Sequence, residues 1–353
     1  MPYIAGITTA NPSNILEQKD AKYFAKQLFG PQAEHLMPVF DNALIDRRHF
    51  AMETEWFFHP HTFTETNDRY IETALALAEE VVLKLADQCG INTEDFDAIF
   101  FVSTTGLSTP SIDARLFNRI SFNSHIKRIP IWGLGCAAGV GGIARASEYV
   151  QAFPKHRALV VSVELCSLAF QLNDHSKSNI VASALFADGA AACLIAGDEV
   201  PNQHRDYSQP SIIGSLSTTY PDTLDVMGWR ITTEGFKIVL SKNIPSIVTS
   251  LVKQNVEELL TLHGISIQNI SHYAAHPGGA KVMDAYAEAL SLSNGELHHS
   301  LDVLREFGNM SSATVFFILD RVLRETGSES NAYGLVSALG PGFSSELVLL
   351  KWN

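Results

Sequence analysis

The chain alternates between amphipathic helical stretches and short, continuously apolar stretches. Residues 67–88 place apolar side chains three and four positions apart, which predicts a helix with one buried face. A glycine, a polar link and the apolar run 98–102 follow, and that run predicts a buried strand. Residues 247–262 repeat the amphipathic pattern and lead, through another glycine, into a predicted strand over 270–275.

A second pair of segments is repeated in the same way. Residues 133–150 (GLGCAAGVGGIARASEYV) and 307–323 (FGNMSSATVFFILDRVL) each combine a glycine turn with a buried helix, and an apolar strand follows each of them. Recurrence of the same units at long separation indicates an internal duplication. Continuously apolar strands between helices predict buried sheets, so two such halves predict an α/β, five-layered α/β/α/β/α double domain. We place the halves at 1–205 and 206–353, because residues 200–215 are polar and rich in turn formers.

The duplication places four side chains at equivalent points. Cys136 heads the buried helix of the first half and Asn309 heads its counterpart, while Thr104 and His276 end equivalent strands. We therefore expect these four residues to face one central cavity.

Cys136 has two interpretations. Unpaired amide groups and the positive end of the dipole at a helix start favour a thiolate, which predicts a pKa below the roughly 8.5 of a free cysteine. The alternative is a buried structural cysteine, the more common fate of a single cysteine.

A Cys, His and Asn set supports acyl transfer. Cys136 would attack a thioester carbonyl, and neutral donors on His276 and Asn309 would stabilise the developing oxyanion. Each residue also has a simpler explanation, since His276 precedes the turn-forming Pro277 and Asn309 suits a helix N-cap. Their joint occurrence at duplicated positions favours the catalytic interpretation.

Composition narrows the function class. The 353 residues carry 25 basic and 38 acidic side chains, a net charge of -13, without a Lys/Arg-rich run, so no nucleic-acid partner is expected. The four cysteines lack CxxC spacing, which argues against zinc and disulfides and for a reducing compartment. His49, His59 and His61 fit no zinc spacing, and no metal is expected. With no signal-peptide pattern and no apolar run near the ~20 residues of a membrane helix, we expect a cytoplasmic protein without a membrane span.

Several motifs resemble one known family. They are GCAAG at 135–139, ALFADGAAA at 184–192, HPGG at 276–279, GNMSSA at 308–313 and GPG at 340–342. From about residue 40 onward the chain resembles the type III polyketide synthases of the chalcone and stilbene synthase family. The resemblance implies the thiolase fold, acyl-CoA and malonyl-CoA as substrates, and no further cofactor. It also implies a homodimer, with the loop around Thr109-Pro110 near the partner's cavity.

The resemblance also assigns roles. Cys136 would carry the starter and the growing chain, and His276 and Asn309 would assist decarboxylation of malonyl-CoA and stabilise the enolate. Phe186 and Phe236 match the two phenylalanines between the CoA tunnel and the cavity. The positions that line the family's cavity are Thr104, Cys166, Ala169, Met227, Ser311 and Leu339.

Departures from the plant enzymes point to a different substrate. Those enzymes have threonine at the positions of Cys166 and Ala169, phenylalanine at Leu339, and, in chalcone synthases, glycine at Met227. Less polar walls suit an aliphatic starter, as in bacterial members that make alkylpyrones or alkylresorcinols. The family's basic residues for CoA phosphates are not matched, and Arg47, Arg48 or Lys281 are the candidate substitutes.

Two other functions stay open. One is a ketoacyl synthase that takes malonyl groups from a carrier protein, which would need a basic docking patch that the sequence does not show. The other is a non-catalytic, thiolase-fold partner subunit, against which the intact Cys136, His276 and Asn309 argue.

Overall fold

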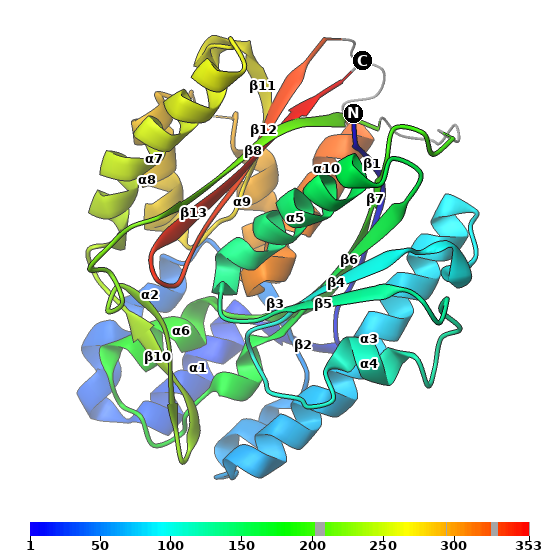
Figure 1. The fold of residues 1–353 in the computed structure, drawn as a ribbon. Helices are drawn as coiled ribbons and strands as arrows, with labels where there is room; N and C mark the ends of the chain where they lie inside the picture. The colour runs from blue at the N-terminus through cyan, green and yellow to red at the C-terminus, as the bar shows by residue number, and fades with distance from the viewer. Residues whose placement is uncertain (202–208, 294, 326–330, 353) are drawn as a thin grey trace.

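Two half-sheets joined edge to edge form the framework of the molecule (Figure 1). The computed structural model describes residues 1–201, 209–293, 295–325 and 331–352. Within these residues a nine-stranded sheet runs in the order β11-β12-β13-β8-β1-β7-β6-β4-β5. Its N-terminal strands are β1 (Tyr3–Ala10), β4 (Ala98–Val102), β5 (Lys127–Ile131), β6 (Arg157–Leu165) and β7 (Asp188–Ala196). Its C-terminal strands are β8 (Ser211–Thr219), β11 (Ile270–Ala275), β12 (Tyr333–Gly340) and β13 (Ser344–Lys351).

The strand order is symmetric about the junction of β1 and β8. On either side, two antiparallel pairings are followed by a parallel one, giving β1-β7-β6-β4 and β8-β13-β12-β11. At the junction Ile4 N donates to Pro210 O (3.1 Å) and Ile212 N donates to Pro2 O (2.8 Å). The predicted duplication is thus confirmed in the strand order. The predicted boundary at 205/206 lies outside the described residues.

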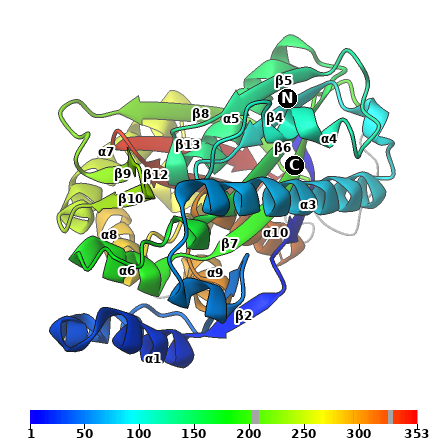
Figure 2. The same ribbon diagram turned by 90° about the horizontal axis from the view of Figure 1, so that it is seen from below.

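Helices separate and cover the half-sheets in five layers. α5 (Ala138–Ala152) and α10 (Thr314–Glu325) lie between them, where α5 contacts β6 and β13 and α10 contacts β1 and β11. α3 (Phe63–Cys89) covers the outer N-terminal face, and α7 (Ile244–Leu262) and α8 (Ala280–Leu290) cover the other (Figures 1 and 2). Three apolar clusters fill the spaces between these layers. Within the described part of the chain, no helix combines the length and apolar character needed to cross a bilayer.

Smaller elements gather outside the layered core. In Figure 2, α1 and β2 lie apart from the central strands. The helices α1 and α2 both pack on α6, and a fourth apolar cluster joins them. Residues 34–62, which have neither a clear helical nor a clear strand pattern, contain the short β3 and α2. The bounds of these elements are β2 (Asn14–Glu17), α1 (Gln18–Phe29), α2 (Pro38–Asp41), β3 (Arg47–Phe50), α4 (Ile112–Leu116), α6 (Lys177–Leu185), β9 (Met227–Thr232), β10 (Gly235–Leu240) and α9 (His298–Phe307).

The two central helices approach each other at Gly139 of α5. A Cβ atom there would lie 2.3 Å from the carbonyl oxygen of Ser312 and 2.9 Å from Cγ1 of Val315, at the start of α10. Neither atom is the far end of a flexible side chain. The contact therefore needs glycine, and it holds the beginnings of both helices together.

We predict that Gly139→Ala destabilises the protein by about 1–3 kcal/mol, because the new methyl group forces α5 away from α10. Urea unfolding of the purified variant measures this change. Gly141→Ala in the same helix is the control, since its Cβ would lie 3.5 Å from Cδ of Glu346, an ordinary contact. That substitution should be neutral or stabilising by up to ~1 kcal/mol through helix propensity. Equal losses in both variants would contradict the packing argument.

Candidate active site

Cys136 lies in a 3-10 turn, Gly135–Ala137, directly before α5. Gly135 has a φ of +48°, and a Cβ atom there would lie 2.6 Å from Cδ of Pro341. The turn between β12 and β13 therefore packs directly on the turn that carries the cysteine. Cys136 keeps part of its surface accessible, whereas the other three cysteines are buried. Cys136 therefore has the accessibility that a nucleophile needs, although desolvation of its thiol opposes the thiolate form.

Ser311 and Asn309 meet Cys136 from the second half. The Sγ atom of Cys136 lies 3.4 Å from Oγ of Ser311, whose backbone N donates to Oδ1 of Asn309 (2.8 Å). Ser311 has a φ of +49°, a strained conformation for a residue with a Cβ atom. Because Oδ1 of Asn309 accepts this backbone hydrogen bond, its Nδ2 amide remains the group that can donate to a ligand. Asn309 does not cap α10, which begins five residues later.

Phe186 pairs with Asn309 in a short β-bridge. Asn309 N donates to Leu185 O and Ala187 N donates to Asn309 O, both at 2.9 Å. The end of α6 and the Asn309 turn are therefore fixed to each other. This bridge places the predicted gate residue Phe186 next to Asn309, one of the predicted catalytic residues.

Arg48 contacts both segments of the bridge between Phe186 and Asn309. Its side chain is 1% exposed, and Nη1 donates to the carbonyl oxygens of Ser183 (2.7 Å) and Phe186 (2.8 Å). A Cβ atom on Gly308 would lie 2.7 Å from Cγ of Arg48, so the arginine stem packs against the Asn309 turn. Burial lowers the pKa of Arg48 to about 9, which leaves it charged at neutral pH. Only Nη1 of the buried guanidinium has hydrogen-bond partners, and Arg48 lies within the pocket lining rather than at the surface, so it is a weaker candidate for CoA phosphates than the exposed Arg47 and Lys281.

His276 follows β11, at the position equivalent to Thr104 after β4. Its backbone N donates to Ser337 O (2.8 Å) on β12, and the same strand ends at Gly340. A Cβ atom on Gly340 would lie 2.7 Å from Cβ of Ala137, so His276 and the Cys136 turn lie at the same end of the sheet. Both ring nitrogens of His276 are buried and have no hydrogen-bond partner among the described residues.

Burial shifts the pKa values of both the Cys136 thiol and the His276 imidazole. It raises the pKa of the Cys136 thiol to about 12, against a smaller lowering by the hydrogen bond to Ser311. Burial also lowers the pKa of His276 to about 4. The predicted fall in the cysteine pKa is therefore wrong, because desolvation outweighs the helix start. Thiol and neutral imidazole are the resting forms, and a thiolate forms only as its proton moves to a base.

Glu164 is a polar centre that the sequence analysis missed. The carboxylate, fully buried near the end of β6, accepts hydrogen bonds from Thr104 N (3.0 Å), Thr105 Oγ1 (2.9 Å) and Ser312 Oγ (2.5 Å). Burial nevertheless raises its pKa to about 7. The network links predicted cavity residue Thr104 to the turn that follows Ser311. A single acidic residue within the apolar run of 157–165 was the available signal, because buried carboxylates are rare unless they are partnered.

An apolar pocket lies beside this site. Its empty volume is about 730 Å³, counted to its open mouth, and Cys166, Ala169 and Phe186 line it together with Arg48 and Trp229. Much of the remaining wall is aromatic, from Phe24, Phe29, Phe40, Phe50, Phe57, Phe58 and Phe170. Three of the predicted gate and cavity residues thus share one wall.

The other predicted gate and cavity residues lie outside the walls of this pocket. Phe236 is buried in β10, and both its ring and that of Phe186 lie 6.1 Å from Trp229, which the sequence analysis did not single out. Met227 begins β9, and Leu339 is buried in β12. Thr104 and Ser311, described above, are also buried. For all five of these residues, a position in the gate or the cavity wall stays a prediction.

We predict that Glu164 makes stability fall as pH rises. Its pKa of about 7 in the folded chain exceeds its ordinary value of 4.5, so the folded state holds an extra proton between these values. The stabilisation is complete below about pH 4.5 and is lost as pH rises through 7. Relative to Glu164→Gln, the wild type should lose on the order of 2–3 kcal/mol between these limits.

Urea unfolding of both proteins at pH 4.5 to 8 measures this difference. Comparison with the glutamine variant removes the contributions of His276 and of Asp188, a second buried carboxyl group, since both proteins share them. Parallel stability curves would contradict the assignment.

Comparisons with known proteins agree with this architecture. Residues 2–199 match the N-terminal domain, and 212–352 the C-terminal domain, of the chalcone and stilbene synthases. The chain is 42% identical over 362 residues to a putative chalcone synthase of Bacillus subtilis, covering 100% of this chain and 99% of that protein. It is 36% identical to a 1,3,6,8-tetrahydroxynaphthalene synthase of Streptomyces peucetius, covering 99% and 93%.

A solved structure is also similar. The crystal structure of 1,3,6,8-tetrahydroxynaphthalene synthase from Streptomyces coelicolor, a bacterial type III polyketide synthase, superposes with a TM-score of 0.93 at 28% identity and 99% coverage of both chains. The expected thiolase fold is thereby confirmed. The chain belongs to the chalcone and stilbene synthase family and is a type III polyketide synthase, an acyltransferase that works by decarboxylative condensation.

Proposed function

We propose that this enzyme loads an aliphatic acyl group from acyl-CoA onto Cys136, extends it with malonyl-CoA and cyclises the product to an alkylpyrone or alkylresorcinol. The observation that carries the proposal is the apolar lining of the pocket beside the site, to which Cys166, Ala169 and Phe186 contribute. An acyl chain lying there would exchange water for aliphatic and aromatic side chains. Each buried methylene is worth about 0.8 kcal/mol, or roughly fourfold in binding.

Loading begins from the neutral pair. The Cys136 sulfur attacks the thioester carbonyl of acyl-CoA as its proton moves to His276, and CoA leaves with a proton as the thiol. With a thiol pKa of about 12 and an imidazole pKa of about 4, Cys136 stays protonated until substrate arrives. The resting cysteine is thereby protected from adventitious alkylation and oxidation, which need the thiolate.

Extension uses the neutral imidazole of His276 and the side-chain amide of Asn309. Nε2–H of His276 and Nδ2–H of Asn309 donate to the thioester oxygen of malonyl-CoA, and the carboxylate leaves as carbon dioxide. The enolate carbon forms a bond to the acyl carbon on Cys136 as the carbon–sulfur bond breaks. The products are a β-ketoacyl-CoA and the Cys136 thiolate, which is the form that attacks the next thioester. A neutral histidine suits this role because it donates without protonating the enolate, and a donor of this kind typically contributes 10²–10³ in rate.

Two exposed cations remain candidates for the CoA phosphates. Arg47 and Lys281 both have exposed side chains, unlike Arg48. Lys281 also lies in the first turn of α8, where the helix dipole favours an anion.

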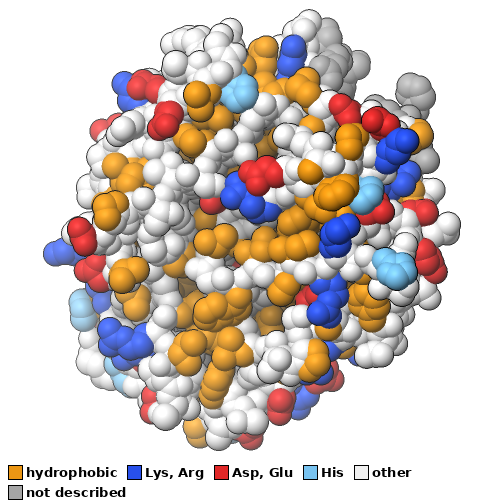
Figure 3. All heavy atoms as spheres, viewed as in Figure 1, with side chains coloured by type: hydrophobic (Ala, Val, Ile, Leu, Met, Phe, Trp, Pro, Cys, Tyr) orange, Lys and Arg blue, Asp and Glu red, His pale blue; other side chains and the backbone are white. Residues whose placement is uncertain are grey.

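We also propose a homodimer, as the resemblance implies. Figure 3 shows apolar side chains gathered in the lower centre of one face. Leu107, two residues before Thr109, is an exposed apolar residue. Trp132 is also exposed, and its Nε1 donates to Gly106 O in the same loop. Light scattering should give twice the 38.7 kDa chain mass, and a monomer at all concentrations would contradict the dimer.

A second product class is favoured by a specific similarity. Two relatives reported above are named as tetrahydroxynaphthalene synthases. If this chain acted in the same way, malonyl-CoA alone would yield an aromatic pentaketide, and aliphatic starters would not be needed. Dependence on a malonyl-carrier protein is the other outcome of the same test.

The proposal is tested by product mass from purified enzyme with malonyl-CoA and acyl-CoA starters from acetyl to stearoyl, plus coumaroyl. We expect triketide or tetraketide pyrones or resorcinols from aliphatic starters, with kcat/KM rising with chain length until the pocket is filled. Products from malonyl-CoA alone would favour the naphthalene product, and activity only with malonyl-carrier protein would favour the ketoacyl synthase. Absence of product with every aliphatic starter would contradict the proposed substrate class.

We predict that Ala169→Phe shortens the longest accepted starter. Ala169 is 6% exposed and its side chain lines the pocket, so a benzyl group there would occupy space needed by the acyl chain. The same product assay across chain lengths measures the effect, and unchanged turnover with the shortest starters is the internal control for folding. An unchanged profile would remove Ala169 from the pocket wall.

A further inference from the structure

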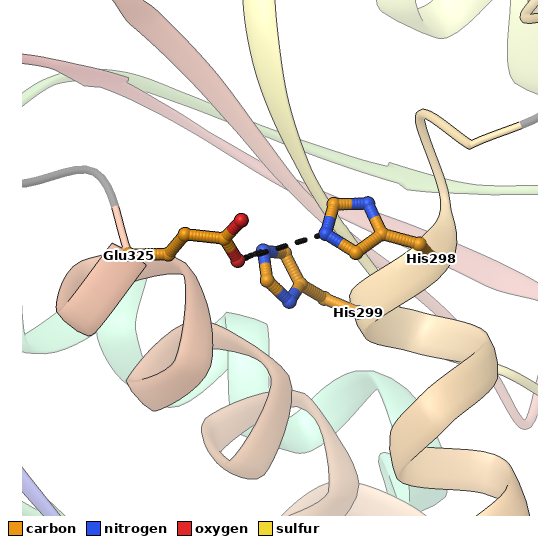
Figure 4. Close-up of side chains that lie close together, drawn as sticks. All are labelled: His298, His299 and Glu325. Carbon is orange, nitrogen blue, oxygen red and sulfur yellow. Dashed lines mark ion pairs between the residues drawn. The ribbon is translucent and has the colours of Figure 1, made fainter.

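Two histidines at the start of α9 and a glutamate at the end of α10 face one another at the surface (Figure 4). Nε2 of His299 lies 2.8 Å, and Nε2 of His298 lies 3.6 Å, from the same Oε2 atom of Glu325. One ligand atom from each of the three residues lies within 4.8 Å of the other two. None of these three residues takes part in the polyketide chemistry described above.

The other histidines considered from the sequence do not form such a group. Within the described residues, His49 places Nδ1 2.8 Å from the carbonyl oxygen of Pro12, and His61 stacks on Trp56 with ring centroids 3.4 Å apart. Among the described residues, only His298, His299 and Glu325 have the spacing of a potential metal site.

The proton positions leave His298 ready to coordinate a cation. Its Nδ1 lies 2.6 Å from the carbonyl oxygen of Gly295, and a carbonyl can only accept, so Nδ1 carries the hydrogen. Nε2 is then the ring nitrogen that faces Glu325 and can coordinate a metal ion. Metal-binding histidines typically donate their other ring N–H to a backbone carbonyl or carboxylate in this way.

Arg321 and Asp302 are each engaged in an ion pair of their own, with Glu306 and Arg305. Glu325 is therefore the carboxylate that faces the two imidazoles.

We propose that His298, His299 and Glu325 bind a divalent transition-metal ion, Zn²⁺ or its analogues Co²⁺ and Ni²⁺. Ligands about 2.1 Å from a tetrahedral zinc ion lie about 3.4 Å from one another, close to the 2.8 and 3.6 Å found here. Imidazole with carboxylate suits these ions. His298 and Glu325 are 48% and 64% exposed, so water can occupy the fourth position.

The ion would link α9 and α10, which form a helical hairpin. α9 and α10 bracket residues 308–313, which include Asn309, and the proposed site lies at the opposite, open end of the pair. Arg321 and Glu306 already join the two helices by a two-point ion pair between these ends. Metal binding would therefore stabilise the hairpin that holds the Asn309 turn, without contact with the reacting atoms.

The test uses the full chain stripped of metal with a chelator. Calorimetric titration with Zn²⁺ should show one equivalent bound, and thermal unfolding should move to higher temperature with added Zn²⁺. Co²⁺ should give visible bands without thiolate-to-cobalt charge transfer, which distinguishes this site from Cys136. His298→Ala and Glu325→Gln should each weaken Zn²⁺ binding at least tenfold, while His125→Ala, at an exposed histidine elsewhere, should not.

Several results would overturn the proposal. They are absence of binding at millimolar Zn²⁺, a thiolate signature in the cobalt spectrum, or unchanged affinity in His298→Ala and Glu325→Gln. His299→Ala provides a third variant, but its ring is mostly buried and the protein could fail to fold. The two exposed positions keep the proposal falsifiable in that case.

Discussion

The close contact between α5 and α10 at Gly139 is the constraint on which the site depends. Each central helix is preceded by a turn, and those turns carry Cys136 in one half and Asn309 with Ser311 in the other. Only a glycine lets the helices begin so near each other, because a methyl group would meet the Ser312 carbonyl at 2.3 Å. The 3.4 Å contact between the Cys136 sulfur and the Ser311 hydroxyl follows from this packing.

Desolvation governs the chemistry of the same region. It keeps the Cys136 thiol and the His276 imidazole neutral and brings the pKa of Glu164 to about 7. An uncharged thiol and an uncharged imidazole suit a neutral thioester substrate. Charge then appears only along the reaction, where donors on His276 and Asn309 can stabilise it.

Much of the architecture could be predicted from the sequence because it follows local periodicity. The repeated helix–glycine–strand pattern predicted the duplication, and short motifs identified the family. Contacts between segments far apart in the chain were not predictable in this way. Arg48 reaches carbonyls at 183 and 186, and Glu164 reaches Ser312 across 148 positions. The direction of the Cys136 pKa was predicted wrongly, because a helix start is visible in sequence whereas depth of burial is not.

The most direct test of the central claim is the mass of the intact protein after brief exposure to an aliphatic acyl-CoA, with peptide mapping of any adduct. The account predicts one acyl group per chain, on the peptide containing Cys136, and none on Cys136→Ala. It also predicts that added malonyl-CoA discharges the adduct. An adduct that persists in Cys136→Ala, or one that malonyl-CoA cannot discharge, would contradict Cys136 as the carrier of the growing chain.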